Sequence, residues 1–276
     1  MTIGVMQGRL LPKYRGRYQA HPVGYWQNEF LVAKELGLSF IEFILDFNDA
    51  EINPLLSKAG KLEILEQVKD SGVQVKTICA DYFMEAPLHS TDINVAKASL
   101  DVLNRLIVRA AELGVSDVVI PCVDHASLRE NYMIDNFVNA IKPLLGKLDE
   151  LNVNLSLETD LGPQEFITLL DRFDSPRITV NYDTGNSAAL GYDPLEELIA
   201  YGDKITDIHI KDRVLGGGPV ILGTGNTDFK KFFAKLKEFD YQGPFIMQAY
   251  RDDEGVKVFQ EQLVWIREIM KDWYAR

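Results

Sequence analysis

Apolar residues recur along this chain in two alternating patterns. Short runs rich in β-branched and apolar residues are typical of strands, and longer stretches carry apolar residues at helical spacing. One such stretch contains Val95, Ser99, Val102, Leu106 and Ala110. The short runs fall at about residues 2–6, 39–45, 74–79, 117–121, 153–158, 178–183, 205–210 and 244–249. The alternation predicts eight βα units, a parallel sheet and right-handed crossovers.

Four helix ends share one sequence pattern. In each, an amphipathic stretch ends, a Gly or Asn follows, and an apolar run begins at once; these residues are Gly37, Gly72, Gly114 and Asn152. Each is predicted to take the left-handed position after the helix. Their spacings of 35, 42 and 38 residues match the length of a βα unit.

Chain length and repeat number together favour one architecture. The chain has 276 residues and no linker-like stretch, so residues 1–276 are predicted to form a single domain. Eight units in this length predict a closed (β/α)8 TIM barrel of the α/β class. A dinucleotide-binding fold is disfavoured because Gly4 and Gly8 are isolated and form no G-x-G-x-x-G motif.

Charge and composition narrow the classes of partner. The formal net charge of −12 argues against nucleic acid, because binding its backbone needs a basic surface. No apolar run reaches the length of a membrane span, and the start of the chain lacks a basic and apolar leader, so we expect a soluble cytoplasmic protein. Cys79 and Cys122 have no C-x-x-C spacing and are interpreted as buried thiols.

Chemistry in a (β/α)8 barrel lies at the carboxyl ends of the strands. Glu158, Asp183, His209 and Gln248 each lie at or one residue before the end of the last four predicted strands in turn. Two carboxylates, an imidazole and an amide oxygen form a plausible ligand set for a divalent metal. A single acidic residue at a strand end can instead cap the next helix, and for Glu42 and Asp46 both readings stay open.

Basic residues gather in the loops of the predicted barrel mouth. Arg9, Lys211, Arg213 and Arg251 would favour a substrate with a phosphate or carboxylate group. Glycines at 216–218 and 223–225 follow the seventh strand, and a helix opening near Thr227 would point backbone amides outward. The alternative is that these glycines give only loop flexibility and the basic residues pair with acidic neighbours. The long loop at residues 8–24 suits a lid, a contact in a homo-oligomer, or plain surface.

These residues also resemble a known family. The segments Tyr182-Asp-Thr-Gly-Asn186 and Asp207-Ile-His-Ile-Lys-Asp212, with the strand end at Glu158, resemble the xylose-isomerase-like TIM barrels of the sugar-phosphate isomerase/epimerase superfamily. The resemblance covers nearly the whole chain. It implies a sugar or sugar-phosphate substrate and one divalent metal ion, Mn²⁺ first and Mg²⁺, Co²⁺ or Zn²⁺ as alternatives. By position, Glu158, Asp183, His209 and Gln248 would hold that metal.

One position departs from the family pattern in a way that bears on the reaction. The family has a second acid/base glutamate where this chain has Gln248, and a substrate-contacting histidine where it has Asn186. An amide cannot exchange a proton near neutral pH. With Glu158 as the only base, proton abstraction beside a carbonyl favours aldose–ketose isomerisation, which needs one base, over 3-epimerisation, which normally needs two. A second group such as Asp81 would restore epimerisation.

Two alternative functions were compared with this one. A family-2 endonuclease acting on abasic DNA would need a trinuclear zinc site with more histidines than the four of this chain, and its acidic charge also disfavours DNA. A barrel that binds a metal or sugar without catalysis is the second, with Gln248 recording the lost activity. Retained Glu158, Asp183 and His209 weigh against it.

Overall fold

The computed structural model describes residues 3–253 and 255–271. Its strands follow one another in chain order around a closed parallel barrel, with helices between the strands. Their bounds are β1 Ile3–Met6, β2 Phe40–Ile44, β3 Gln74–Cys79, β4 Asp117–Cys122, β5 Asn154–Thr159, β6 Ile178–Asp183, β7 Ile205–Ile210 and β8 Phe245–Met247. The predicted (β/α)8 barrel is therefore confirmed. Residue 2, which was predicted to begin the first strand, lies outside the described residues.

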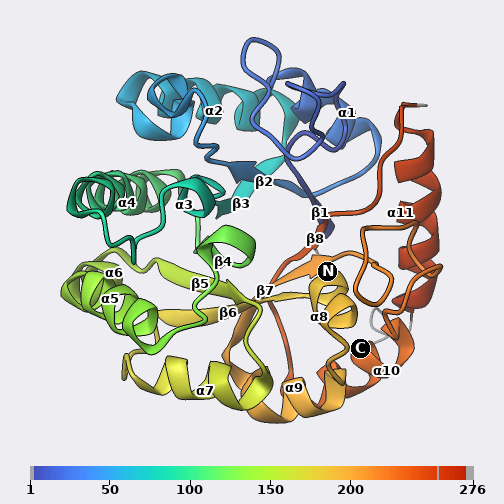
Figure 1. Ribbon diagram of the computed structural model, residues 1–276. Coiled ribbons are helices and arrows are strands. Elements are labelled where there is room, and N and C mark those ends of the chain that lie inside the picture. The colour runs from blue at the N-terminus through green and yellow to red at the C-terminus, as the bar shows by residue number, and fades with distance from the viewer. Residues whose placement is uncertain (1–2, 254, 272–276) are drawn as a thin grey trace. The chain divides into compact units, whose positions relative to one another are not determined.

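Helices occupy the segments between the strands, and a last helix follows β8 (Figure 1). The α-helices are α1 Asn28–Glu35, α2 Lys58–Ser71, α3 Tyr82–Glu85, α4 Ile93–Leu113, α5 Asn131–Ile141, α6 Leu145–Leu151, α7 Pro163–Asp171, α8 Thr184–Leu190, α9 Pro194–Tyr201, α10 Phe229–Leu236 and α11 Lys257–Ile269. Short 3-10 helices are η1 Ala50–Ile52, η2 Pro54–Leu56, η3 Asp124–Ala126, η4 Lys142–Leu144, η5 Gly202–Lys204 and η6 Lys237–Phe239.

The predicted left-handed residues are present at the helix ends. Gly37, Gly72 and Gly114 have φ of +67°, +80° and +73°, and Asn152 has φ of +53°. Gly72, Gly114 and Asn152 directly follow α2, α4 and α6. Such residues end a helix because their backbone turns out of the helical path at little steric cost. The sequence pattern therefore located the helix-to-strand junctions correctly.

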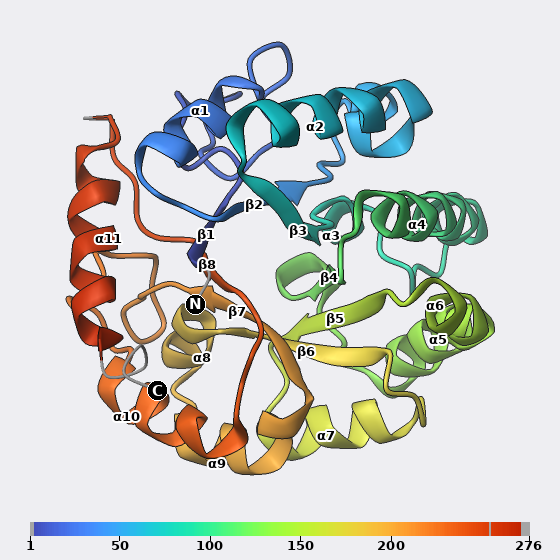
Figure 2. The ribbon, with the colours of Figure 1, turned by 180° about the vertical axis from the view of Figure 1, so that it is seen from behind.

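The chain divides into two compact units. One comprises residues 42–179 and the other residues 1–41 with 180–276, so the predicted single domain stays a prediction. In the first unit, β3, β4 and β5 pair in parallel, with Thr77 opposite Asp117 and Asp117 opposite Asn154. Helix α4 packs against α2 and α6, and the three helices lie outside these strands in the views of Figures 1 and 2.

The second unit pairs β6, β7, β8 and β1 in parallel. Asp183 lies opposite His209, and Phe245 lies opposite both Ile208 and Ile3. Helices α9 and α10 pack against each other in this unit, as Figure 2 shows. Strand β8 is shorter than predicted and ends at Met247. The backbone amide of Gln248 nevertheless donates to the Ile210 carbonyl at 3.0 Å. Gln248 therefore stays beside the end of β7.

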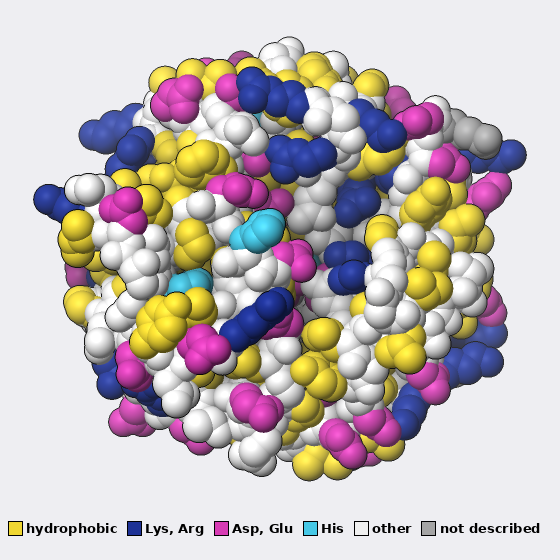
Figure 3. Space-filling model, viewed as in Figure 1, with side chains coloured by type: hydrophobic (Ala, Val, Ile, Leu, Met, Phe, Trp, Pro, Cys, Tyr) yellow, Lys and Arg dark blue, Asp and Glu magenta, His cyan; other side chains and the backbone are white. Residues whose placement is uncertain are grey.

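Apolar strand residues are almost all buried, as expected for a parallel sheet covered by helices. Polar residues occupy the surface, and Figure 3 shows basic and acidic side chains interspersed on the face that it presents. Among the described residues, no helix has both the length and the apolar character that a membrane crossing requires.

Candidate metal and substrate site

Three of the predicted metal ligands lie at adjoining positions in the unit of β6, β7 and β8. Asp183 ends β6 opposite His209 on β7, and Gln248 follows β8 directly. The exposed fractions of Asp183, His209 and Gln248 are 5%, 0% and 3%. Polar groups are costly to bury without a partner or a ligand, so their gathering at one sheet edge needs a chemical explanation.

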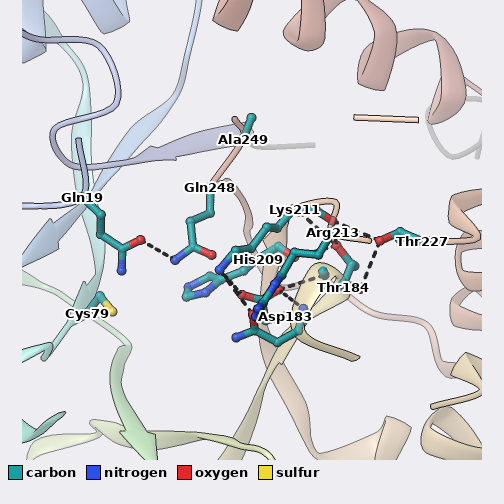
Figure 4. Close-up of polar contacts among 12 residues, drawn as sticks. Gln19, Cys79, Asp183, Thr184, His209, Lys211, Arg213, Thr227, Gln248 and Ala249 are labelled. Atoms are coloured by element: carbon teal, nitrogen blue, oxygen red, sulfur yellow. Dashed lines mark hydrogen bonds and ion pairs between the residues drawn. The ribbon is translucent and has the colours of Figure 1, made fainter. Parts of the chain in front are cut away.

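Asp183 has its carboxylate fixed from two sides. Its Oδ1 accepts hydrogen bonds from the backbone amides of Gly185 and Asn186, both at 2.8 Å, and so caps α8. Its Oδ2 lies 3.3 Å from Lys211 Nζ (Figure 4). Gly185 permits this arrangement, because a Cβ atom there would lie 2.7 Å from Lys211 Cγ. The carboxylate is therefore held in place before any ligand binds.

Gln248 presents its two amide atoms to different surroundings. Its Nε2 donates to Gln19 Oε1 at 2.7 Å, while its Oε1 is buried and has no hydrogen-bond partner among the described residues. In Figure 4 the amide nitrogen points to Gln19 and the oxygen points away from it. A buried carbonyl oxygen without a partner costs about 1–3 kcal/mol, which a metal ligand bond would offset. The oxygen therefore fits the role of a metal ligand.

Glu158 belongs to the other unit, where several carboxylates gather. It is buried near the end of β5, opposite Pro121 on β4. Burial raises the pKa of the Cys79 thiol well above its usual range, and the carboxylates of Asp81, Glu42 and Glu158 raise that pKa further. Like charges brought together away from water favour a bound cation. Glu158 therefore lies in an acidic environment that suits a metal ligand.

Other acidic residues near the strand ends have local partners. Asp81 accepts a hydrogen bond from Cys79 Sγ at 3.1 Å, and Asp160 accepts one from Ser127 at 2.6 Å. The first 3-10 helix after β2 has no side-chain cap, and Asn53 caps the second by accepting from Leu55 at 3.0 Å. Glu42 and Asp46 therefore cap neither of these helices, although both are buried. Cys79 and Cys122 are buried free thiols, as predicted.

A basic cluster lies beside Asp183. The Oδ1 of Asn186 accepts from Lys211 Nζ at 3.3 Å and from Arg213 Nη1 at 2.7 Å. Arg213 also donates from Nε to the Gly217 carbonyl at 2.9 Å. Lys211 is anchored at its backbone by the Thr184 hydroxyl, which donates to the Lys211 carbonyl at 2.7 Å. Of the predicted substrate-binding residues, Asn186, Lys211 and Arg213 thus form one connected group.

The glycine-rich loop after β7 is arranged differently from the prediction of outward-pointing amides. The backbone amides of Gly223 and Gly225 donate to Asp212 Oδ2, both at 2.9 Å, and that of Thr227 donates to Asp212 Oδ1 at 3.0 Å. Asp212 is 1% exposed. These three amides therefore donate to a buried carboxylate of the chain and do not point outward. Sequence reasoning missed this role of Asp212.

Arg9 and Arg251 join the first loop to the segment after β8. Arg9 Nη1 donates to the Ala249 carbonyl at 3.2 Å, and Arg251 Nη1 donates to the Arg9 carbonyl. The Arg251 guanidinium also lies 4.6 Å from the centre of the Tyr18 ring. Both arginines are largely buried. The two arginines therefore connect the first loop to the segment after β8. The sequence predicted them only as substrate-binding residues.

Glu29 is a second buried carboxylate that sequence reasoning missed. It accepts hydrogen bonds from the amides of Gly8 at 2.8 Å and Leu10 at 3.0 Å. Burial raises the pKa of Glu29 to about 7, against the opposing effect of these bonds and of the Arg251 and Arg9 charges. Gly8 has φ of +88°, and a Cβ atom there would meet the Tyr18 carbonyl at 2.0 Å. A glycine at position 8 was the one sequence signal for this tight turn.

The donor set as a whole suits a divalent metal. His209 and several buried carboxylates belong to sets of donor residues that could hold a metal ion. Carboxylate, imidazole and amide oxygen donors match Mn²⁺, Mg²⁺, Co²⁺ or Zn²⁺ without selecting one of them.

Curated relatives of this chain include sugar-phosphate epimerases. A putative L-ribulose-5-phosphate 3-epimerase of Haemophilus influenzae is 25% identical over 264 residues, which are 89% of this chain and 92% of the relative. An L-ribulose-5-phosphate 3-epimerase of Escherichia coli O1:K1 / APEC is 26% identical over 243 residues, 85% of this chain and 86% of the relative.

A similar fold is found in a solved structure and in a family model. The crystal structure of 3-keto-D-glucoside 4-epimerase from E. coli in its apo form superposes with a TM-score of 0.75 at 17% identity, covering 97% of this chain and 99% of that one. The family model described as xylose isomerase-like TIM barrel matches residues 30–269. That match spans most of the sequence, and so the chain belongs to the xylose isomerase-like TIM barrel family.

Proposed function

We propose that this protein is a divalent-metal-dependent isomerase or epimerase of sugars or sugar phosphates. The observation that carries the proposal is the buried Gln248 oxygen, which has no hydrogen-bond partner among the described residues. Gln248 directly follows β8, which pairs with the strand of His209, and that strand pairs in turn with the strand of Asp183. Family membership supports it, as do the two relatives, whose names give L-ribulose 5-phosphate as substrate.

The proposed metal ligands are Glu158, Asp183, His209 and Gln248. They are the last or next-to-last residues of β5, β6 and β7 or directly follow β8, and these strands are consecutive in the barrel. Active sites of this fold lie at that end of the strands. When bound, the ion, Mn²⁺ being our first choice, supplies Lewis-acid polarisation of the substrate carbonyl. Asp183 is already oriented for this by the α8 amides and Lys211.

Glu158 is proposed as the base that removes the proton beside the substrate carbonyl. Gln248 is neutral and exchanges no proton near pH 7, so it binds and orients only. One base on one face of the substrate can move a proton between two neighbouring carbons, and this favours aldose–ketose isomerisation.

The second candidate reaction is 3-epimerisation, which the names of the two relatives favour. Inversion at one carbon needs a proton donor on the opposite face. Asp81 is the proposed source, although its carboxylate already accepts from Cys79 Sγ at 3.1 Å. That contact uses Oδ1, so a proton carried on Oδ2 would leave the contact with Cys79 in place.

The substrate is proposed to carry an anionic group that binds at Asn186, Lys211 and Arg213. The two cations lie within hydrogen-bonding distance of one Asn186 oxygen, so their positive charges are already close together in a protein of net charge −12. A phosphate satisfies such a pair by charge-assisted hydrogen bonds. Arg9, in the loop after β1, and Arg251, in the segment after β8, are proposed to add positive potential.

Proton exchange in D₂O tests the reaction. The Mn²⁺-loaded protein would be incubated with L-ribulose 5-phosphate, with its unphosphorylated form, and with a panel of other ketoses and aldoses. Deuterium incorporation with aldose–ketose conversion is the expected result. If deuterium instead enters at C3 with inversion of that carbon, the reaction is 3-epimerisation and the isomerisation proposal is wrong.

Glu158→Gln is the control for the base, and we expect it to abolish exchange. If it leaves exchange unchanged, the assignment of Glu158 is wrong. If the wild-type protein binds these sugars but exchanges no proton with any of them, the catalytic proposal fails in favour of a sugar-binding barrel.

A further inference from the structure

An amide side chain can serve as a metal ligand only if its oxygen faces the metal. Gln248 could present either its oxygen or its NH₂ group inward, because the two have nearly the same size and shape. In the structure its Nε2 donates to Gln19 Oε1 at 2.7 Å, which leaves its buried Oε1 on the other side (Figure 4). The neighbour of the NH₂ group therefore decides which atom is available.

Gln19 has the same ambiguity, and Arg9 resolves it. Arg9 Nη2 donates to Gln19 Oε1 at 3.1 Å. A guanidinium has only donors and stays charged at all ordinary pH values, so Gln19 must turn its oxygen toward Arg9. That same oxygen accepts from Gln248. Gln248 must consequently offer its NH₂ group to Gln19.

Arg9 is itself held in place. Its second terminal nitrogen donates to the Ala249 carbonyl at 3.2 Å, and its own carbonyl accepts from Arg251. Ala249 is the residue after Gln248, so the arginine is fixed to the same segment that carries the proposed ligand. The direction of both amides is thus set by a buried cation anchored beside them.

We infer that Gln19 is a positioning residue for Gln248, and that the chain of hydrogen bonds Arg9–Gln19–Gln248 turns the Gln248 oxygen toward the metal. This inference rests on the proposed function. It also accounts for glutamine at position 248: a carboxylate there would place an oxygen without a proton against the Gln19 oxygen. The long first loop gains a defined purpose, which is to bring Gln19 to the end of β8.

Metal affinity measured without substrate tests this inference. Mn²⁺ binding would be measured by titration against a chelator for the wild type, Gln19→Leu, Gln19→Glu, Gln248→Leu and the double variant Gln19→Leu/Gln248→Leu. Residues that orient a ligand typically change metal affinity about 10–100-fold when mutated, so Gln19→Leu should weaken Mn²⁺ binding about tenfold or more. The double variant should bind no more weakly than Gln248→Leu, because both changes remove the same contact.

Gln19→Glu separates orientation from packing. A glutamate still accepts from both Arg9 and Gln248, so its Mn²⁺ affinity should stay near that of the wild type. The exposed Gln242 supplies a matched control, and Gln242→Leu should leave affinity unchanged. If Gln19→Glu loses as much affinity as Gln19→Leu, the orienting role is overturned.

The outcomes also distinguish this inference from the proposed function. If Gln248→Leu leaves Mn²⁺ affinity unchanged, the proposed ligand set is wrong. If Gln248→Leu weakens Mn²⁺ binding while Gln19→Leu does not, the ligand set stands and only the positioning role of Gln19 is overturned.

Discussion

Glu29 shows how one residue can make stability depend on pH. Its pKa is about 7 in the folded chain and 4.5 in its ordinary environment, so the folded state holds a proton that the unfolded state has lost between these values. The contribution of Glu29 to stability is therefore complete below pH 4.5 and is lost as the pH rises to about 7. The difference corresponds to about 3 kcal/mol.

Urea unfolding from pH 4.5 to 8 would measure this contribution. The free energy of unfolding of the wild type, relative to Glu29→Gln, should fall by about 3 kcal/mol across that range. Glu63→Gln changes an exposed carboxylate on α2 and should show a constant offset. Parallel pH profiles for the wild type and Glu29→Gln would contradict the assignment.

Arg213 allows a test of the anionic group on the substrate. Its guanidinium donates to Asn186 Oδ1 and to the Gly217 carbonyl, whereas the Asp183 carboxylate is bound by the Gly185 and Asn186 amides and by Lys211. Arg213→Met should raise KM for a sugar phosphate about tenfold, equivalent to about 1.4 kcal/mol, and should change KM for the free sugar much less. Steady-state kinetics with both substrates measure the difference, with exposed Lys230→Met as the control. Equal effects on both substrates would remove the phosphate assignment.

Residue identity predicted the candidate ligands but not the contacts that orient them. Asp183 and His209 could be paired from the sequence because each closes an apolar run, and parallel strands bring such ends to one edge. Gln19 could not be found in this way. It lies in a loop without periodicity, and its partner Gln248 is 229 residues away in the chain.

At the scale of the element, the Asp212 side chain holds part of the loop between β7 and α10 in place. Asp212 accepts from the amides of Gly223, Gly225 and Thr227, and a Cβ atom at Gly225 would lie 2.3 Å from Asp212 Oδ1. Bonds to a charged acceptor contribute about 1.5–3 kcal/mol each, so losing part of this set should open the loop.

Hydrogen exchange of these amides tests the role of Asp212. Asp212→Asn keeps one acceptor oxygen and replaces the other by a donor, so exchange at Gly223, Gly225 and Thr227 should become at least about tenfold faster. Asp203→Asn, an exposed change in η5, should leave their exchange rates unaltered. Unchanged protection in Asp212→Asn would show that the loop is held by other contacts.

Elements were more predictable than the loops between them. The strands at 178–183 and 205–210 were placed with their observed bounds, because strand patterns and the left-handed residues after helices are local signals. The loop after β7 was less predictable for the converse reason. Its glycines showed that the backbone turns tightly, but which group its amides would meet depends on the distant placement of Asp212.

At the scale of the whole molecule, the open question is whether the two compact units unfold together. We predict that they do, because the strands form one closed barrel and opening it would expose unpaired strand edges. The sequence offers a convenient probe: tryptophan occurs at positions 26, 265 and 273 and therefore only in the unit of residues 1–41 and 180–276.

A tryptophan added to the other unit would report on it separately. Tyr132 on α5 is 50% exposed, so Tyr132→Trp should be tolerated. Urea unfolding would be followed by fluorescence in the wild type, by fluorescence in Tyr132→Trp, and by circular dichroism in both. Coincident midpoints are expected for a single cooperative domain. If the signal from position 132 changes at a different urea concentration, the two units unfold independently, and the prediction of a single cooperative domain is wrong.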